Sequence, residues 1–246
     1  MEFPPSIHQS TLMWGTVAYP GVRTMTASAF PPNPASRLPS GRHGLTREAV
    51  QASQRGRLVE AMAQVVADKG YAATTVADVV ERAGVSRRTF YEQFTDKEAC
   101  FLAAYDVGLA VVLGRIAETA GGAGPAAGWR DRARAGVEAF LGLLAAEPAF
   151  ARALQVEILT AGPAALQRRA GMLATFSGVW RGVYEAARAE DPALPVLPDE
   201  VFAVLTAGFE ELIRDCIRTH GPGALPSLAE PILRTVFAVF GGRPPA

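Results

Sequence analysis

The chain has 246 residues, of which 49% are hydrophobic, and its 24 Lys and Arg residues equal its 24 Asp and Glu residues. This length and apolar content suffice for one small and one larger folded domain. A net charge of zero excludes an overall basic surface, so any nucleic-acid binding must depend on a local group of cations.

Residues 1–44 are rich in Pro, Ser and Ala and lack the periodicity of a helix or a strand, so we expect a disordered tail. The apolar stretch at 11–19 is too short to span a membrane. The residues before it include Glu2 but no Lys or Arg, which makes it a poor signal peptide. We therefore expect a cytoplasmic protein that does not contact a membrane.

Two interpretations of this tail stay open. Met25 offers a second start site, in which case part of the tail is not translated. Alternatively the tail is a flexible arm, and Arg37 and Arg42 reach a DNA phosphate or a neighbouring groove.

The first helix is expected from about Thr46 or Gln51 to Lys69, and Gly70 ends it. Its apolar residues recur at helical spacing and form one core stripe: Leu58, Ala61, Met62, Val65 and Val66.

The next stretch, Thr74–Lys97, reads TTVADVVERAGVSRRTFYEQFTDK and predicts a helix, a tight turn and a second helix. Thr75 and Asp78 have the spacing of a capping box at the start of the first of these helices, and Ser86 caps the second. This is the outline of a helix-turn-helix DNA-binding domain, which we place at residues 45–95.

The second of these helices has a buried side formed by Phe90 and Phe94, four residues apart. On a 3.6-residue wheel Arg88, Thr89 and Glu92 lie opposite, Tyr91 lies on one flank, and Arg87 and Gln93 lie nearer the core edge. Arginine can hydrogen-bond guanine and glutamate the cytosine amine, while a threonine methyl can meet thymine and a tyrosine hydroxyl suits phosphate. The alternative for Arg88 and Glu92 is an ion pair with each other.

Thr95 and Glu98 are expected to form a second capping box, with Lys97 in the first turn of the following helix. A lysine there opposes the helix dipole, so we expect a nearby anion, namely a DNA phosphate. The alternative is a small solvated helical hairpin in which Lys97 extends into water.

These residues carry a resemblance. The segment Arg57–Asp106 resembles the DNA-binding region of the tetracycline-repressor (TetR/AcrR) family of bacterial transcription regulators, by landmarks such as Ala83-Gly84-Val85-Ser86, Phe90-Tyr91 and Asp96-Lys97-Glu98. The resemblance implies DNA contacts by Thr75, Arg87, Arg88, Tyr91, Gln93 and Lys97. The motif departs from many members at Gln93 and Arg88, so the operator sequence cannot be taken from a relative. Together the two arguments give these candidate DNA-binding residues: Thr75, Ser86, Arg87, Arg88, Thr89, Tyr91, Glu92, Gln93 and Lys97.

The remainder, residues 96–246, is expected to be a larger all-α domain, with a linker near 121–128. Its expected helices are 96–118, 129–147, 149–160, 163–189, 199–219 and 225 or 227 to 240. The last two carry wide apolar stripes that either cover their own domain or, as the resemblance implies, build a four-helix homodimer interface. The candidate interface residues are Val201, Leu205, Phe209, Leu212, Ile213, Ile232, Val236, Phe237 and Phe240.

Aromatic residues on the middle helices, among many Gly and Ala, can enclose an apolar ligand cavity, or they are ordinary core. The candidate pocket residues are Phe140, Leu144, Phe150, Leu154, Glu157, Phe176, Trp180 and Tyr184, with Gln155, Glu157 or Tyr184 orienting the ligand.

Enzyme motifs are missing from the sequence: no HExxH, no serine elbow and no Walker loop is present, and the histidines are His8, His43 and His220. Cys100 and Cys216 have no neighbouring ligands at metal-binding spacing, and each is expected to be buried and reduced. We expect no catalytic residue, metal or cofactor.

We therefore expect a homodimeric, ligand-responsive regulator that represses transcription by binding a palindromic double-stranded DNA operator. A small hydrophobic molecule bound in the second domain would release it. The alternative is a helical ligand-binding or protein-interaction module whose DNA-binding domain is vestigial.

Overall fold

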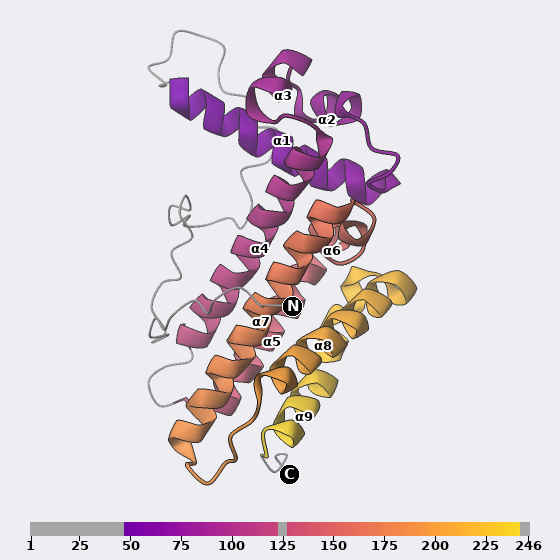
Figure 1. Ribbon diagram of the computed structural model, residues 1–246. Coiled ribbons are helices and arrows are strands. Elements are labelled where there is room, and N and C mark those ends of the chain that lie inside the picture. The colour runs from indigo at the N-terminus through magenta and orange to yellow at the C-terminus, as the bar shows by residue number, and fades with distance from the viewer. Residues whose placement is uncertain (1–46, 123–126, 242–246) are drawn as a thin grey trace, which may run out of the picture.

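The computed structural model describes residues 47–122 and 127–241, and this part of the chain contains helices and no strand (Figure 1). The all-α prediction is confirmed. The expectations for the tail, including Met25, Arg37 and Arg42, lie outside the described residues. Of the expected linker at 121–128, Gly121 and Gly122 still belong to a helix, and residues 123–126 are not described.

The first three helices form an N-terminal domain: α1 (Arg47–Lys69), α2 (Val76–Ala83) and α3 (Arg87–Gln93). The buried side of α1 carries Leu58, Met62 and Val66, which are fully buried, and α1 packs against α2, α4 and α6. At its end Gly70 adopts φ +82°, a left-handed conformation that glycine tolerates, and the chain turns toward α2.

Helix α4 (Lys97–Gly122) leads from the N-terminal domain into the rest of the molecule. Its cap is Asp96, whose carboxylate accepts a hydrogen bond from the Ala99 N–H at 2.7 Å. The expected box of Thr95 and Glu98 is therefore wrong by one residue, because the Asp96 carboxylate accepts from the free Ala99 N–H of the first turn.

By length and hydropathy alone, α4 is a helix that could span a membrane. In the structure it packs along α1, α5, α6 and α7, and core helices of soluble proteins have the same composition. Length and composition do not separate these two roles.

The C-terminal domain comprises α4 and the elements that follow it. These are α5 (Trp129–Ala146), α6 (Pro148–Gln155), the 3₁₀ helix η1 (Glu157–Leu159), α7 (Pro163–Glu190), α8 (Asp199–His220), the 3₁₀ helix η2 (Pro222–Leu228) and α9 (Ala229–Val239). The expected helix 149–160 is thus divided at Val156, and a 3₁₀ helix precedes α9.

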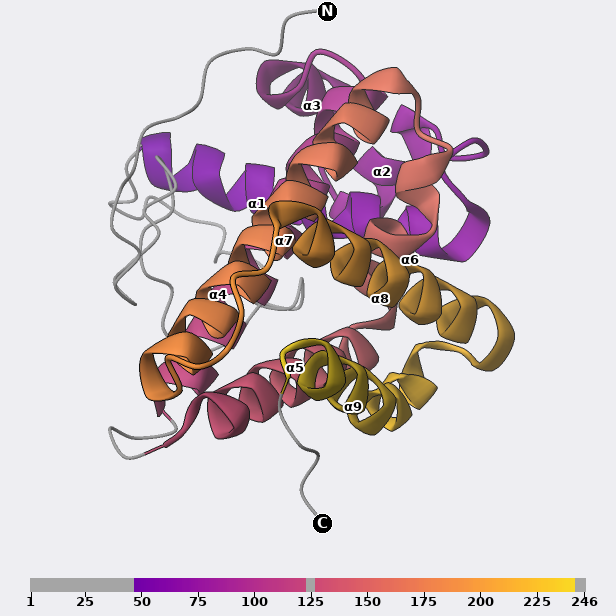
Figure 2. The same ribbon diagram turned by 60° about the horizontal axis from the view of Figure 1, so that its bottom comes forward.

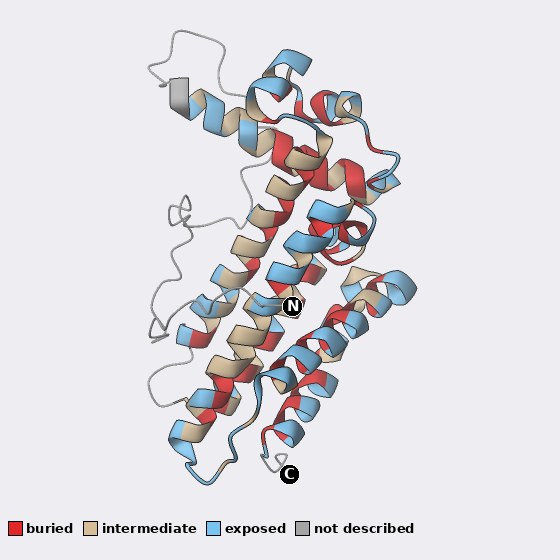
Figure 3. Ribbon diagram, viewed as in Figure 1, coloured by how far each residue is buried: buried red, intermediate tan, exposed pale blue. Residues whose placement is uncertain are grey.

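Helix α7 lies beside α4 and α8, and α9 lies beside α5, an arrangement that a view turned by 60° shows again (Figure 2). Buried and exposed residues alternate around α8 and α9, so each helix has an inner and an outer face (Figure 3). One continuous apolar core runs from α1 through α4 and α5 to α9.

Candidate DNA-binding surface and ligand cavity

The turn between α2 and α3 has the geometry that the sequence predicts. Thr75 and Asp78 form a capping box, in which the Asp78 N–H donates to Thr75 Oγ1 at 3.3 Å and the Thr75 N–H donates to Asp78 Oδ2 at 2.8 Å. Gly84 ends α2 in the left-handed conformation, at φ +63°. Ser86 accepts from the Thr89 N–H at 3.0 Å and so caps α3. Local capping therefore sets where α2 begins and ends and where α3 begins.

Thr75 is held by a charged neighbour. Its hydroxyl lies 2.6 Å from Asp78 Oδ2, and Lys69 Nζ is 2.5 Å from the same oxygen. The hydrogen bonds from Lys69 and then Thr75 keep the pKa of Asp78 well below its usual range. Asp78 is thus a carboxylate at neutral pH, and the Thr75 side chain is oriented at the N-terminus of α2.

The outer side of α3 is open to solvent. Phe90 and Phe94 are buried as predicted, and the two rings lie 5.8 Å apart. Tyr91 is 58% exposed, and its ring meets Phe90 edge to face. The other candidates on this helix divide into exposed and half-buried side chains: Ser86, Arg87, Arg88 and Glu92 are exposed, and Thr89 and Gln93 are half-buried. Arg87 is thus more accessible than the wheel predicts.

Arg88 and Glu92 form an ion pair one helical turn apart, with Arg88 Nε 3.0 Å from Glu92 Oε1. Their side chains are 88% and 52% exposed. A pair this exposed contributes only about 0.3–0.5 kcal/mol. Either side chain can therefore exchange its partner for a base edge at little cost.

Lys97 has a partner that the sequence did not indicate. Its Nζ donates to the Tyr71 carbonyl at 2.9 Å and lies 4.2 Å from the centre of the Tyr71 ring. The half-buried ammonium is thus held at the start of α4, beside the first turn of N–H groups.

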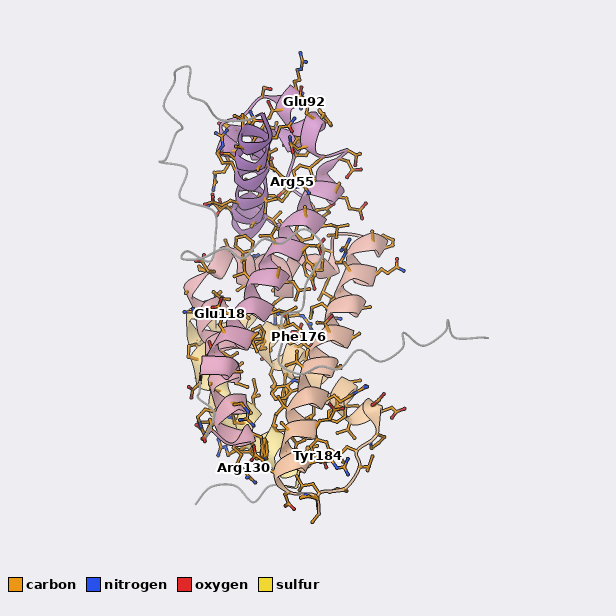
Figure 4. All side chains as sticks on the ribbon, turned by 90° about the vertical axis from the view of Figure 1, so that its left-hand side faces the viewer. Arg55, Glu92, Glu118, Arg130, Phe176 and Tyr184 are labelled. Atoms are coloured by element: carbon orange, nitrogen blue, oxygen red, sulfur yellow. The ribbon has the colours of Figure 1, made fainter. Side chains whose placement is uncertain are left out.

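Arg55 is a further cation at this surface that sequence reasoning missed. Its guanidinium lies 4.3 Å from the centre of the Phe94 ring and donates to the Gln93 carbonyl at 3.1 Å. Figure 4 shows Arg55 and Glu92 at the N-terminal domain, while Phe176 lies midway along the C-terminal domain. No motif marks Arg55, because the turn of α1 that carries it faces α3 only after folding.

The C-terminal domain contains a cavity of about 60 Å³ between α4, α5, α7, α8 and α9. Three of the predicted pocket residues line it, Phe140, Phe176 and Trp180. The wall is otherwise mainly apolar and includes Ile116, Ala120, Val137, Val179, Val183, Phe209, Ile213 and Ile232. Its polar side chains are Arg132, Thr206 and Glu210.

Five predicted pocket residues do not line this cavity. Leu144, Phe150 and Leu154 are buried elsewhere, the last two on α6, which packs against α1. The Tyr184 hydroxyl donates to the Pro195 carbonyl, which turns it away from a ligand. Glu157 accepts a hydrogen bond from the Tyr71 N–H at 2.9 Å and so contacts the other domain. Aromatic content alone does not tell which side of a helix faces a void.

Glu210 is the polar group in this cavity that sequence reasoning overlooked. It is only 4% exposed, and Gln155 Nε2 donates to its Oε1 at 3.3 Å. Burial raises the pKa of this carboxyl, which Gln155 and the more distant Arg169 and Arg214 partly oppose. A carboxyl in the apolar stripe between Phe209 and Ile213 was the available signal.

The predicted dimer residues are mostly internal. Leu205, Phe209, Ile213, Ile232, Val236, Phe237 and Phe240 are all less than 9% exposed within the single chain. They present almost no area to a second copy in this structure of a single chain. Their stripes cover their own domain, which was the alternative. Of the nine candidates only Val201 and Leu212 remain accessible.

The described residues hold no group of three or more His, Cys, Asp or Glu placed to bind a metal ion. Cys100 and Cys216 are both buried and unpaired with each other.

Comparison with known proteins agrees with this architecture. Residues 58–104 match the family described as bacterial regulatory proteins, tetR family. No curated protein sequence matches the chain. Similar solved structures include the fatty acid degradation regulator FadR from Bacillus halodurans, with a TM-score of 0.68, 16% identity and coverage of 77% of this chain and 97% of that one.

Two further structures have ligands or functions in their descriptions. FadR from Bacillus subtilis, in complex with stearoyl-CoA, has a TM-score of 0.64 and 18% identity over 73% of this chain and 96% of its own. The ketosteroid regulator KstR2 of Mycobacterium tuberculosis has a TM-score of 0.55 and 20% identity over 76% and 94%. Residues 58–104 thus match the DNA-binding segment of the tetR family, and the chain shares the fold of these solved regulators.

Proposed function

We propose that this protein is a cytoplasmic repressor that binds a palindromic operator as a homodimer and leaves it when a small hydrophobic molecule enters the C-terminal cavity. The proposal rests on the presence of two features in one chain. The first is the exposed surface of α3 in a capped helix-turn-helix, and the second is an apolar cavity next to α4. Stearoyl-CoA in the similar FadR structure supports an apolar effector here.

The exposed face of α3 enters the major groove in this proposal. Arg87, Arg88 and Glu92 contact base edges, and Tyr91 contacts phosphate. The N-terminal ends of α2 and α4, with Thr75 and Lys97, meet the sugar-phosphate backbone on either side. Ser86, Thr89 and Gln93 support these contacts from the edge of the same surface. Arg55 adds a cation beside α3.

The homodimer interface in this proposal is the outer face of α8 and α9. Its small or apolar exposed residues are Ala203, Val204, Ala207, Gly208, Leu212, Pro231, Thr235, Ala238 and Val239, and the charged Glu211, Asp215 and Arg234 are exposed among them. Val204 is 71% exposed and Leu212 is 47% exposed, which is unusual for large apolar side chains in one patch. Two such helix pairs form a four-helix bundle, and the dimer places two α3 helices for half-sites about 34–36 Å apart.

The size of the cavity suggests how ligand and DNA compete. Its 60 Å³ is far below the roughly 300–1,000 Å³ of ligand pockets for drug-sized molecules. A bound effector therefore has to separate the surrounding helices, and α4 carries Ile116 and Ala120 in the wall and Lys97 at its other end. The effector binds the expanded state more tightly, and DNA binds the compact state more tightly. This difference in affinity couples the two sites.

Genome-wide footprinting in the source cell tests this function. We expect a few palindromic sites, including one upstream of the protein's own gene, with transcription rising when the gene is deleted. If the protein protects no specific site while the purified chain is folded, the DNA-binding domain is vestigial and the ligand-binding alternative is correct.

A further inference from the structure

The cavity contains one buried carboxyl that the rest of the chain leaves half-satisfied. Glu210 Oε1 accepts from Gln155, whereas Glu210 Oε2 is buried and has no hydrogen-bond partner among the described residues. Gln155 Oε1, behind it, also lacks a donor. Leaving buried acceptors unpaired is costly, and polar groups in native interiors are nearly always paired. Two acceptors at this end of the cavity are therefore unpaired. The Tyr105 hydroxyl and Arg214 Nη2 are buried donors that also lack a partner among the described residues, but neither is hydrogen-bonded to Glu210 or Gln155.

The negative charge of Glu210 is also not neutralised by a close cation. No Lys or Arg nitrogen within the described segments lies within 4 Å of its carboxylate oxygens. Arg214, the nearest candidate on the same helix, donates to the Gln155 carbonyl at 3.0 Å and pairs with the Glu211 carboxylate. Arg132, at another part of the wall, is 3.0 Å from Glu190. Arg132 and two of the guanidinium nitrogens of Arg214 thus have other partners. Arg214 Nη2 is buried without a partner among the described residues, and Arg169 and Arg214 act on Glu210 only from beyond 4 Å.

The walls next to this carboxyl are aromatic. Trp180 and Phe209 lie 5.6 Å apart between ring centres, and Phe140 and Phe176 lie 5.5 Å apart. All four rings line the cavity together with Glu210. Aromatic faces attract a cation, most strongly where water is excluded. A carboxylate beside several rings has the chemistry of a site for an organic cation.

From these contacts we propose that the effector is an amine: a protonated nitrogen bound by Glu210 and carried on an apolar body that fills the aromatic part of the cavity. This inference rests on the proposed ligand-responsive function and specifies its ligand class. The ammonium donates to Glu210 Oε2 and supplies the missing positive charge.

The length of the cavity limits the apolar body. Its wall on α5 extends from Arg132 to Phe140, eight residues, which is about 12 Å along a helix. A phenylbutyl group has about this reach. The matched compounds 4-phenylbutylamine, 4-phenylbutanol and 4-phenylbutyrate therefore present an ammonium, a hydroxyl and a carboxylate on the same body.

The experiment measures the affinity of the full-length protein for these three compounds by calorimetry, and repeats it with Glu210→Gln. We expect the wild type to bind the amine at least about tenfold more tightly than the alcohol, as for hydrogen bonds to charged groups, and the butyrate least. Glu210→Gln keeps the shape of the side chain and removes its charge. It should lose the preference for the amine over the alcohol, because a buried ammonium then has no opposite charge.

Thr206→Val is the matched control, because Thr206 lines the same cavity on the same helix and is uncharged. It should keep the preference for the amine. Equal wild-type affinity for amine and alcohol, no binding of any compound, or an amine preference that persists in Glu210→Gln overturns the proposal. The wild-type ratio decides even if Glu210→Gln does not fold. DNA footprinting separates this failure from failure of the regulatory function, since it requires no effector.

Discussion

The backbone N–H of Tyr71 donates to the carboxylate of Glu157 at 2.9 Å, and this hydrogen bond joins the N-terminal domain to the C-terminal domain across 86 residues of sequence. Glu157 follows Gln155 closely, and Gln155 binds the cavity carboxyl of Glu210. On the other side, the Tyr71 carbonyl accepts from Lys97. The segment from Gln155 to Glu157 therefore contacts the cavity carboxyl at one end and the N-terminal domain at the other.

Gly70 directly precedes Tyr71, so its replacement tests how closely the chain packs against Glu157 at this hydrogen bond. The residue has φ +82°, and a Cβ there would lie 3.4 Å from Glu157 Oε2. Gly70→Ala should therefore lower the free energy of unfolding by about 1–2 kcal/mol, the usual cost of a left-handed conformation with a side chain. Urea unfolding measures it.

Gly142→Ala provides the control. Gly142 lies inside α5, and a Cβ there meets no atom within 4 Å. It should raise the free energy of unfolding by about 1 kcal/mol, because alanine is the better helix former. If Gly70→Ala is as stable as Gly142→Ala, the chain at residue 70 has room for a side chain, and the contact with Glu157 is not closely packed.

The parts of this structure that were predictable from sequence are those fixed by neighbouring residues. Thr75, Asp78 and Ser86 cap their helices through contacts three residues apart, so the helix-turn-helix follows from local spacing. Which side of α8 faces inward depends on packing against helices that are distant in sequence. A wide apolar stripe is equally compatible with core packing and with a dimer interface, so the sequence alone does not distinguish them. Glu210 was missed for the same reason, because its cavity is assembled from five helices.

Lys97 gives a test of the phosphate contact. If its ammonium leaves Tyr71 for a DNA phosphate, Lys97→Met should weaken binding to all sequences similarly. The slope of log affinity against log salt should fall in magnitude by about 0.9 for each phosphate that is no longer neutralised. Titrations at several salt concentrations measure this. If Lys97→Met keeps the wild-type salt slope and only lowers the free energy of unfolding, Lys97 does not contact phosphate and its role is the hydrogen bond to Tyr71.

Arg88 and Glu92 allow a sharper test, because their ion pair in the free protein is weak and exposed. If each side chain reads a base, Arg88→Ala should relax one position of each half-site, and Glu92→Gln should change a neighbouring position. Each good base contact discriminates by about 1–3 kcal/mol. Selection of sites from a random DNA library with each variant shows the preferred sequence. The same motif for both variants and the wild type would mean that the two residues only pair with each other.

The proposed dimer surface predicts different outcomes for an exposed and a buried substitution. Val204→Asp places a charge on the exposed face of α8 and should yield folded monomers. Phe237→Asp, at a residue only 2% exposed, should instead unfold the chain. Light scattering and circular dichroism distinguish these outcomes. Val196→Asp, at a 77% exposed residue outside the patch, is the control and should remain dimeric. A dimeric Val204→Asp protein would place the interface elsewhere.

The buried carboxyl of Glu210 predicts how stability changes with pH. Burial raises its pKa in the folded protein above the ordinary value of 4.5, against smaller opposing effects of Gln155, Arg169 and Arg214. The protonated form is thus favoured by folding. Its stabilising contribution is complete below about pH 4.5 and is lost as the pH rises through the folded pKa.

Glu210→Gln removes this dependence, because the amide does not ionise. We expect the variant and the wild type to have similar free energies of unfolding at pH 4.5, and the variant to become the more stable of the two as the pH approaches 8. Urea unfolding at a series of pH values measures the difference. Glu185→Gln, which changes an exposed carboxylate on α7, should follow the wild type at every pH. If Glu210→Gln also follows the wild type from pH 4.5 to 8, Glu210 titrates as a solvated carboxyl, and burial does not control its charge.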